Sequence, residues 1–124
     1  MFEKCPCGVG VSYLSCCAPL HHGKQEAETP EQLMRARYSA YARSDAAYLL
    51  PSWSLGTRPA DLGDLGDRQW LGLTLEDALP PKGDEGIVQF TARFKQGGSE
   101  ASLRERSHFL KSGGRWFYVK GEIF

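Results

Sequence analysis

The sequence predicts an α+β fold in which helices pack on one face of a curved antiparallel sheet. Two observations predict it. Apolar side chains recur at helical spacing between residues 29 and 50, whereas polar and apolar side chains alternate from residue 70 onward. Helices that precede a run of connected strands are typical of the α+β class. The 124 residues, 41% of them hydrophobic, suffice for one domain with one core.

The long helix is expected to begin after Thr29, which provides an N-cap, while Pro30 suits the first turn and Gln32 completes a capping box. A second, shorter helix follows a cap at Ser44-Asp45 and ends near residue 50, because the following proline limits its continuation. The side chains expected on one side of the long helix are Leu33, Met34, Arg37, Tyr38 and Tyr41.

Four strands are predicted in the alternating region, and the glycine-rich stretches between them suit hairpin connections. In the second and third strands one face is less charged, and we assign it to the interior. This face includes Glu105, whose carboxylate needs a buried partner such as Arg37 or Arg58. The strands are expected near residues 70–77, 86–96, 101–111 and 115–121, with a connector at 18–28 and an acidic loop at 54–69. The interior face comprises Val88, Phe90, Ala92, Phe94, Leu103, Glu105, Ser107 and Phe109.

The charge balance argues against one class of function. Fifteen basic and fifteen acidic residues cancel, whereas a dedicated nucleic-acid-binding protein usually carries a large positive excess. A weaker alternative is one basic surface whose affinity for nucleic acid falls steeply with salt. Its residues would be Arg93, Lys95, Arg104, Arg106 and Lys111. Because no stretch is apolar and long enough to cross a bilayer and no signal-peptide layout is present, we expect a soluble, cytoplasmic protein.

The four cysteines are the strongest chemical signal, because all of them lie within the first seventeen residues. A disulfide framework would connect distant segments, whereas this cluster would close only very short loops. Four thiolates satisfy the tetrahedral preference of zinc, and Gly8 and Gly10 allow the tight turn that such a site needs. A site closed by four protein ligands leaves no position for a substrate water, so the metal is expected to be structural. The expected zinc ligands are Cys5, Cys7, Cys16 and Cys17.

Two alternatives remain open at the cysteines. Adjacent side chains diverge unless the backbone is turned, so His21 or His22 could replace Cys17 as the fourth ligand. The adjacent Cys16 and Cys17 could instead form a redox-active pair.

The cysteine segment, residues 5–17, resembles the SEC-C motif, the zinc knuckle at the carboxyl end of the SecA translocase ATPase. Nearly the whole chain is similar to the YchJ-like family of bacterial SEC-C motif proteins. The resemblance implies a zinc knuckle and connector at residues 1–28, joined to a nuclear-transport-factor-2-like cone at residues 29–124. It implies no established activity. The residues that carry it include Thr29-Pro30-Glu31, Arg35-Ala-Arg37-Tyr38-Ser-Ala-Tyr41, Trp70-Leu-Gly-Leu73 and Gly114-Arg-Trp116-Phe-Tyr118.

The sequence departs from the SEC-C pattern after Cys7. That pattern usually has a glycine-serine-glycine-lysine run with further basic residues, whereas this chain has Gly8-Val9-Gly10-Val11. The resemblance therefore does not transfer the partners of SecA. We expect the two valines to dock the knuckle onto the main domain.

These observations favour a non-catalytic binding or interaction module with a protein or small-molecule partner, and pairing of two copies through the exposed sheet face is left open. The alternative is a small-molecule-binding protein or an enzyme that uses a pocket in the cone, with Glu105 as acid or base and Arg58 orienting the substrate. A deep cavity that contains Glu105 and an arginine would favour this alternative, and a cavity filled by tryptophans would exclude it. The expected pocket residues are Tyr38, Trp53, Arg58, Trp70, Glu105, Ser107 and Trp116.

Overall fold

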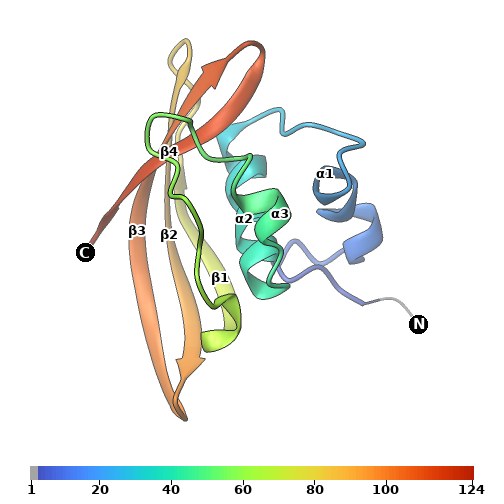
Figure 1. Ribbon diagram of the computed structural model, residues 1–124, viewed down its shortest axis with the longest axis vertical. Coiled ribbons are helices and arrows are strands. Elements are labelled where there is room, and N and C mark those ends of the chain that lie inside the picture. Colours follow the sequence, from blue (N-terminus) through green and yellow to red (C-terminus); the bar gives the residue numbers. More distant parts are fainter. Residues whose placement is uncertain (1–2) are drawn as a thin grey trace.

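The computed structural model describes residues 3–124 and confirms the α+β class. Its sheet is an antiparallel meander in the order β1-β2-β3-β4, and α2 lies between this sheet and the N-terminal segment (Figure 1). The helices are α1 (Ala18–His21), α2 (Pro30–Ala42) and α3 (Ala46–Leu49), with 3-10 turns at Tyr13–Ser15 and Leu65–Asp67. The strands are β1 (Gln69–Ala78), β2 (Glu85–Gln96), β3 (Ser99–Ser112) and β4 (Arg115–Ile123).

The helix starts follow the capping signals in the sequence. The Thr29 side chain accepts a hydrogen bond from the Gln32 amide, 3.1 Å away, and Pro30 occupies the first turn of α2. The Gln32 side chain accepts from the amide of Glu28, one residue earlier than a standard capping box would place it. Asp45 caps α3 by accepting from the Tyr48 amide. The predicted connector contains an unforeseen helix, α1, whose four residues are too few to show a helical period.

The sheet is built from long hairpins with tight turns. Gln96 pairs with Ser99 and Ser112 pairs with Arg115, so only two glycines connect the strands in each case. All four of these glycines have φ between 59° and 84°, as a type I′ turn requires. Register shifts interrupt the β1–β2 ladder twice and the β3–β4 ladder once. Because such bulges bend and twist a strand, they give the sheet its curvature.

The concave face of the sheet packs on α2, as the strand alternation predicts. Val88 and Ala92 are 1% exposed and Phe109 is 2% exposed, and they form one core cluster with Leu33 and Met34 of α2. Within residues 3–124 no helix combines the length and apolarity needed to cross a membrane.

The N-terminal segment packs on the other side of α2. Tyr13, Ala18 and Leu20 are buried in a second cluster that includes Ala36 of α2. The prediction that Val9 and Val11 make this contact is wrong, because they are 51% and 46% exposed.

Candidate ligand cavity and metal centre

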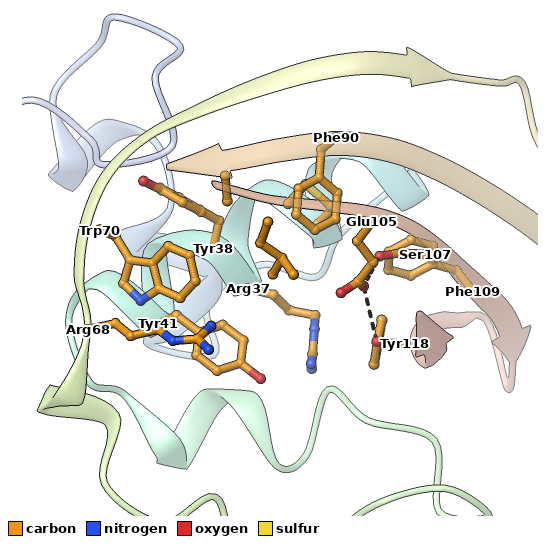
Figure 2. A pocket seen from close by; sticks show the side chains of 13 residues that line it. Arg37, Tyr38, Tyr41, Arg68, Trp70, Phe90, Glu105, Ser107, Phe109 and Tyr118 are labelled. Carbon is orange, nitrogen blue, oxygen red and sulfur yellow. Dashed lines mark hydrogen bonds between the residues drawn. The ribbon is translucent and has the colours of Figure 1, made fainter. Parts of the chain in front are cut away.

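A cavity of about 190 Å³ lies between α2 and the concave face of the sheet. Its walls are mainly aromatic and aliphatic, and its charged groups are Glu105 from β3, Arg37 from α2 and Arg68 from the segment before β1 (Figure 2). No tryptophan fills it, since Trp70 is the only tryptophan among its lining residues. The lining residues are Met34, Arg37, Tyr38, Tyr41, Arg68, Trp70, Phe90, Ala92, Leu103, Glu105, Ser107, Phe109 and Tyr118.

Glu105 is held in position by one hydroxyl group of its own strand, β3, and one of the neighbouring strand, β4. Its Oε2 accepts a hydrogen bond from Ser107 Oγ at 2.6 Å and another from the Tyr118 hydroxyl at 3.2 Å. A side chain at Gly121 would overlap this carboxylate, so the glycine in β4 makes the space that Glu105 occupies. Burial raises the pKa of Tyr118, and the neighbouring Glu105 raises it further, so this phenol stays a proton donor.

Arg37 is buried beside the same cavity and is only 5% exposed. Its NH1 donates to Ser52 Oγ at 2.5 Å and to the Leu49 carbonyl at 3.1 Å. Its guanidinium carbon lies 4.2 Å from the ring centroid of Tyr118 and 4.6 Å from that of Trp53. Burial lowers the pKa of Arg37, and nearby groups including Glu105 oppose this shift. The guanidinium is thus stabilised by neutral acceptors and aromatic faces.

The structure brings together four of the seven expected pocket residues, namely Tyr38, Trp70, Glu105 and Ser107. The expectation for the other three needs correction. Arg58 donates from Nε and NH2 to the Trp53 carbonyl and from NH2 to the Pro51 carbonyl, so it stabilises the loop after α3. Trp53 covers Arg37 from outside the cavity, and Trp116 is buried in the core beside Pro30.

Four polar lining residues were not in the expected pocket set, namely Arg37, Tyr41, Arg68 and Tyr118. Arg37 was one of two candidate partners for Glu105, and Tyr41 was expected on the same side of the helix without a role in the cavity. Arg68 follows a turn-rich stretch that shows no periodicity, so no signal in the sequence places its side chain. The pocket thus depends on a loop whose path only the structure gives.

The basic residues considered for nucleic acid do not all share one face of the sheet, and one of them is paired with an acid. Arg93, Arg104 and Arg106 alternate with the buried residues and lie on the outer face of the sheet. Lys111 is an odd number of residues from Arg104 and Arg106 along β3, so it belongs to the other face. Arg104 Nε forms an ion pair with Glu76 at 2.9 Å, and Arg106 Nε donates to the Gln89 side chain.

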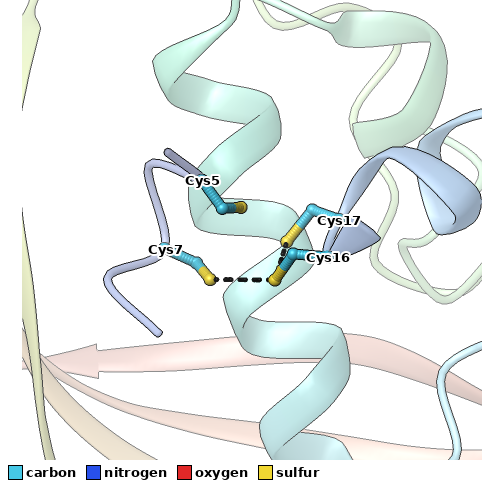
Figure 3. Close-up of side chains that lie close together, drawn as sticks. All are labelled: Cys5, Cys7, Cys16 and Cys17. Carbon is cyan, nitrogen blue, oxygen red and sulfur yellow. Dashed lines mark hydrogen bonds between the residues drawn. The ribbon is translucent and has the colours of Figure 1, made fainter. Parts of the chain in front are cut away.

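The four cysteine sulfur atoms meet at the N-terminal end of the chain, all within 4.8 Å of one another (Figure 3). The Sγ atoms of Cys7 and Cys16 are 3.6 Å apart, and those of Cys16 and Cys17 are 3.9 Å apart. A tetrahedral zinc ion with Zn–S bonds of about 2.3 Å requires S–S edges of about 3.8 Å. The donor type and spacing therefore fit a single zinc ion.

Local backbone geometry explains how closely spaced cysteines converge. The Cys5 amide donates to the Val11 carbonyl at 2.9 Å, which closes the first loop, and Gly8 and Gly10 have φ of 85° and 99°. At Cys16 the backbone adopts φ −118° and ψ −94°, so the chain turns between the adjacent cysteines. This turn gives Cys16 and Cys17 the common direction that sequence reasoning required of two neighbouring ligands.

The thiols cannot all ionise without a compensating charge. The hydrogen bond from Cys17, with further backbone and thiol donors, lowers the pKa of Cys7 to about 5. Burial and the neighbouring sulfurs raise the pKa of Cys16 to about 12, and the bond to Cys7 together with burial raises that of Cys17 further. The thiolate of Cys7 is thus favoured and those of Cys16 and Cys17 are opposed, so binding through four thiolates requires a cation at their centre.

Neither histidine belongs to the cysteine cluster, which contains Cys17. The His21 ring is buried between the rings of Tyr13 and Tyr48, 5.5 Å and 4.7 Å away between centroids. Its Nε2 lies 2.8 Å from the Ala36 carbonyl and therefore donates, which leaves Nδ1 to accept from the Tyr13 hydroxyl at 2.7 Å. Burial lowers the pKa of His21, in agreement with this neutral form. His22 is exposed.

The cluster is fastened to α2 by polar contacts. Arg35 donates from NH1 to the Cys7 carbonyl at 2.8 Å and pairs with Glu31 on the same helix. The Cys5 sulfur lies 3.5 Å from the hydroxyl of Ser39, which is completely buried. The helix that forms the floor of the cavity thus also supports the cysteine cluster.

Together, the fold and the cysteine cluster define a SEC-C motif protein with a nuclear-transport-factor-2-like cone. The chain is similar to the solution structure of a SEC-C motif containing protein from Rhodopseudomonas palustris, with a TM-score of 0.86 and 38% identity over 98% of this chain and 99% of that one. It is also similar to the crystal structure of a SEC-C motif containing protein from Psychrobacter arcticus, with a TM-score of 0.82 and 25% identity over 98% and 83% of the two chains.

Sequence comparisons give the family. The model of the YchJ middle NTF2-like domain matches residues 29–121. The chain is 47% identical over 120 residues to a UPF0225 protein from Xanthomonas oryzae pv. oryzae, covering 94% of this chain and 92% of that protein. It is 48% identical over 120 residues to a UPF0225 protein from Deinococcus radiodurans, covering 95% and 88%. The chain therefore belongs to the YchJ, or UPF0225, family, as the resemblance predicted.

Proposed function

We propose that the chain is a non-catalytic binding module whose N-terminal segment is stabilised by one structural zinc ion. The convergence of four cysteine sulfurs at tetrahedral spacing supports this proposal most strongly. Cys5, Cys7, Cys16 and Cys17 would hold the ion. A metal with four protein thiolates is closed to substrate, so it supplies folding free energy rather than chemistry at an open coordination position.

The zinc would organise a segment that contains little regular secondary structure. Residues 3–17 contain one short 3-10 turn, and Val9, Val11 and Leu14 are exposed. The division into a knuckle with connector at residues 1–28 and a cone at residues 29–124 is part of this proposal. In it the knuckle covers α2 and the cone presents the binding site.

The test is the metal content of the full chain, purified without chelators or an affinity metal, together with a count of reactive thiols. We expect one zinc per chain and thiols that react only after the metal is removed. The Cys16→Ser variant is expected to lose zinc, whereas Ser15→Ala, its exposed neighbour, is expected to retain it. Absence of zinc from the unaltered protein, with two disulfides or four reactive thiols, would overturn the proposal and favour a redox role.

A second candidate function is small-molecule binding in the cone cavity. It is favoured by one observation, a cavity that contains Glu105 and two arginines and that no tryptophan fills. The role once considered for Arg58 is not supported, because its donors are used by the carbonyls of Trp53 and Pro51. We therefore propose binding without catalysis at this site. Titration with small fragments of different charge, monitored by amide NMR shifts, tests whether ligands of any kind enter the cavity.

A further inference from the structure

The cavity contains opposite charges that do not neutralise each other. Glu105 is bound by the hydroxyls of Ser107 and Tyr118, and Arg37 by a serine hydroxyl and a carbonyl. Within residues 3–124 neither side chain forms an ion pair, either with the other or with another residue. Both charges are thus kept in place by neutral groups. A ligand between them can offer an acceptor to Arg37 and a donor to Glu105.

The second arginine gives the cavity a positive balance. The Arg68 guanidinium carbon lies 4.3 Å from the ring centroid of Phe94 and 5.9 Å from that of Trp70, and no carboxylate of the described chain forms an ion pair with it. Two guanidinium groups therefore face one carboxylate. This balance favours an anionic ligand over a cationic one.

The polar groups are distributed over opposite sides of an aromatic cavity. Figure 2 shows Glu105, Ser107 and Tyr118 on one side and Arg68, Tyr41 and Trp70 on the other, with Arg37 between them. The rings of Tyr38 and Trp70 meet edge to face, with centroids 5.8 Å apart, as do those of Phe109 and Tyr118. Between them these rings offer faces and edges against which a planar ring packs.

The volume limits the size of the ligand. The cavity measures about 190 Å³, below the range of about 300–1,000 Å³ that holds drug-sized molecules. A single ring with short substituents fits this space, whereas a nucleotide or a lipid does not.

We propose that the cone cavity binds a small aromatic carboxylic acid that carries a hydroxyl or similar neutral donor on its ring. The carboxylate lies toward Arg37 and Arg68, the ring packs between the aromatic walls, and the ring hydroxyl donates to the Oε1 of Glu105. This inference rests on the second candidate function, because it requires that the cavity accepts ligands. It does not depend on the zinc site.

The test compares four related probes on the full-length, zinc-loaded protein by calorimetry and amide NMR shifts. 4-Hydroxyphenylacetate has the donor and the carboxylate, phenylacetate lacks the donor, p-cresol lacks the carboxylate, and tyramine has an ammonium group in its place. We expect 4-hydroxyphenylacetate to bind at least about tenfold more tightly than each of the others, since each lost charged hydrogen bond costs about that much.

Two variants test which protein side chain binds each end of the ligand. Glu105→Gln is expected to abolish the preference for 4-hydroxyphenylacetate over phenylacetate. Arg68→Gln is expected to weaken both acids several-fold and to leave p-cresol unchanged, and since Arg68 is exposed this variant is expected to fold even if Glu105→Gln does not. Matched controls on the outer face and at a hairpin, Arg106→Gln and Glu100→Gln, are expected to bind all four probes as the unaltered protein does.

The outcomes separate this inference from the function on which it rests. If p-cresol or tyramine binds as tightly as 4-hydroxyphenylacetate, the ligand class is wrong and small-molecule binding in the cavity stands. If none of the four probes binds, the ligand class is also wrong, and cavity binding itself fails only if fragments of every charge leave the amide shifts of α2 and β3 unchanged. Unaltered affinity in both Glu105→Gln and Arg68→Gln would overturn the assigned contacts.

Discussion

His21 connects the cysteine segment to α2 and is the residue whose role the sequence left most open. The ring donates to one backbone carbonyl, accepts from the Tyr13 hydroxyl and packs between two tyrosine rings. Both ring nitrogens are thus hydrogen-bonded, and the ring packs against two tyrosines. A metal ligand at this position would need a free ring nitrogen directed at the sulfurs, and neither nitrogen is available.

The His21→Ala variant tests this structural role. We expect it to lower the free energy of unfolding by about 2–4 kcal/mol, since it removes two buried hydrogen bonds and leaves a cavity between aromatic rings. Urea unfolding measures the change. The exposed neighbour provides the control, and His22→Ala is expected to change stability by less than about 0.5 kcal/mol. Loss of zinc from the folded His21→Ala protein, with Cys17 still present, would show that the histidine ligates the metal after all.

Gly121 is the second residue whose identity follows from a close contact. Its missing side chain leaves room for the Glu105 carboxylate, and its backbone pairs with Ser107. Gly121→Ala is expected to destabilise the protein by about 1–3 kcal/mol, because the added methyl group must displace a held carboxylate. Gly56→Ala, where nothing lies within 4 Å of the added carbon, is the control for the change from glycine to alanine in urea unfolding. Equal effects of the two substitutions would contradict the close contact.

At the scale of elements, α2 supports both candidate sites. One side contributes Arg37, Tyr38 and Tyr41 to the cavity, and the other carries Arg35 and Ser39, which contact the cysteine segment. Ala36 and Ala40 are completely buried, as small residues must be where a helix is covered closely. The position of this helix therefore couples the cysteine cluster to the cavity wall.

The N-cap of α2 gives a prediction for the element as a whole. Thr29→Ala removes the acceptor for the Gln32 amide and is expected to lower the free energy of unfolding by about 1 kcal/mol. Thr57→Ala, in an exposed turn with only a 3.5 Å hydrogen bond, is the matched control and is expected to have a smaller effect. Thermal or urea unfolding that fails to distinguish the two variants would show that α2 is positioned by packing alone.

The elements that the sequence predicts well are those whose signals are local. The alternation along β2 and β3 and the diglycine turns depend only on residues close together in the sequence. These local signals predicted the strand positions and the inward direction of Glu105. The choice between Arg37 and Arg58 was not local. It depends on the path of residues 50–69, where side chains such as Arg58 satisfy loop carbonyls at positions that no periodicity encodes.

At the scale of the whole molecule, the sequence placed the four cysteines in one site because few other arrangements are open to closely spaced thiols. It did not predict which side chains would dock that site. The valines were expected there, and tyrosine, leucine and alanine side chains occur instead. Docking depends on how α1 turns the chain back onto α2, and a helix of four residues has no sequence period from which it can be read.

Removal of the metal is expected to act unevenly across the molecule. Chelation should increase amide hydrogen exchange throughout residues 3–28 and in the part of α2 that they cover, because the segment would lose the cross-link that the proposed zinc ion supplies. The paired central strands β2 and β3 are expected to keep their protection, since their core contacts lie on the opposite side of α2. Uniform loss of protection in all strands would show that the cone cannot fold without the knuckle, and no change anywhere would show that the metal is not structural.

X-ray absorption at the zinc edge of the purified full-length protein tests the central claim most directly, because it counts the ligand atoms around the metal. Four cysteine ligands predict four sulfur neighbours at about 2.3 Å and no nitrogen or oxygen at about 2.0–2.1 Å. A spectrum with three sulfurs and one imidazole nitrogen would contradict the assignment of Cys17, and a sample without bound zinc would contradict the structural metal site itself.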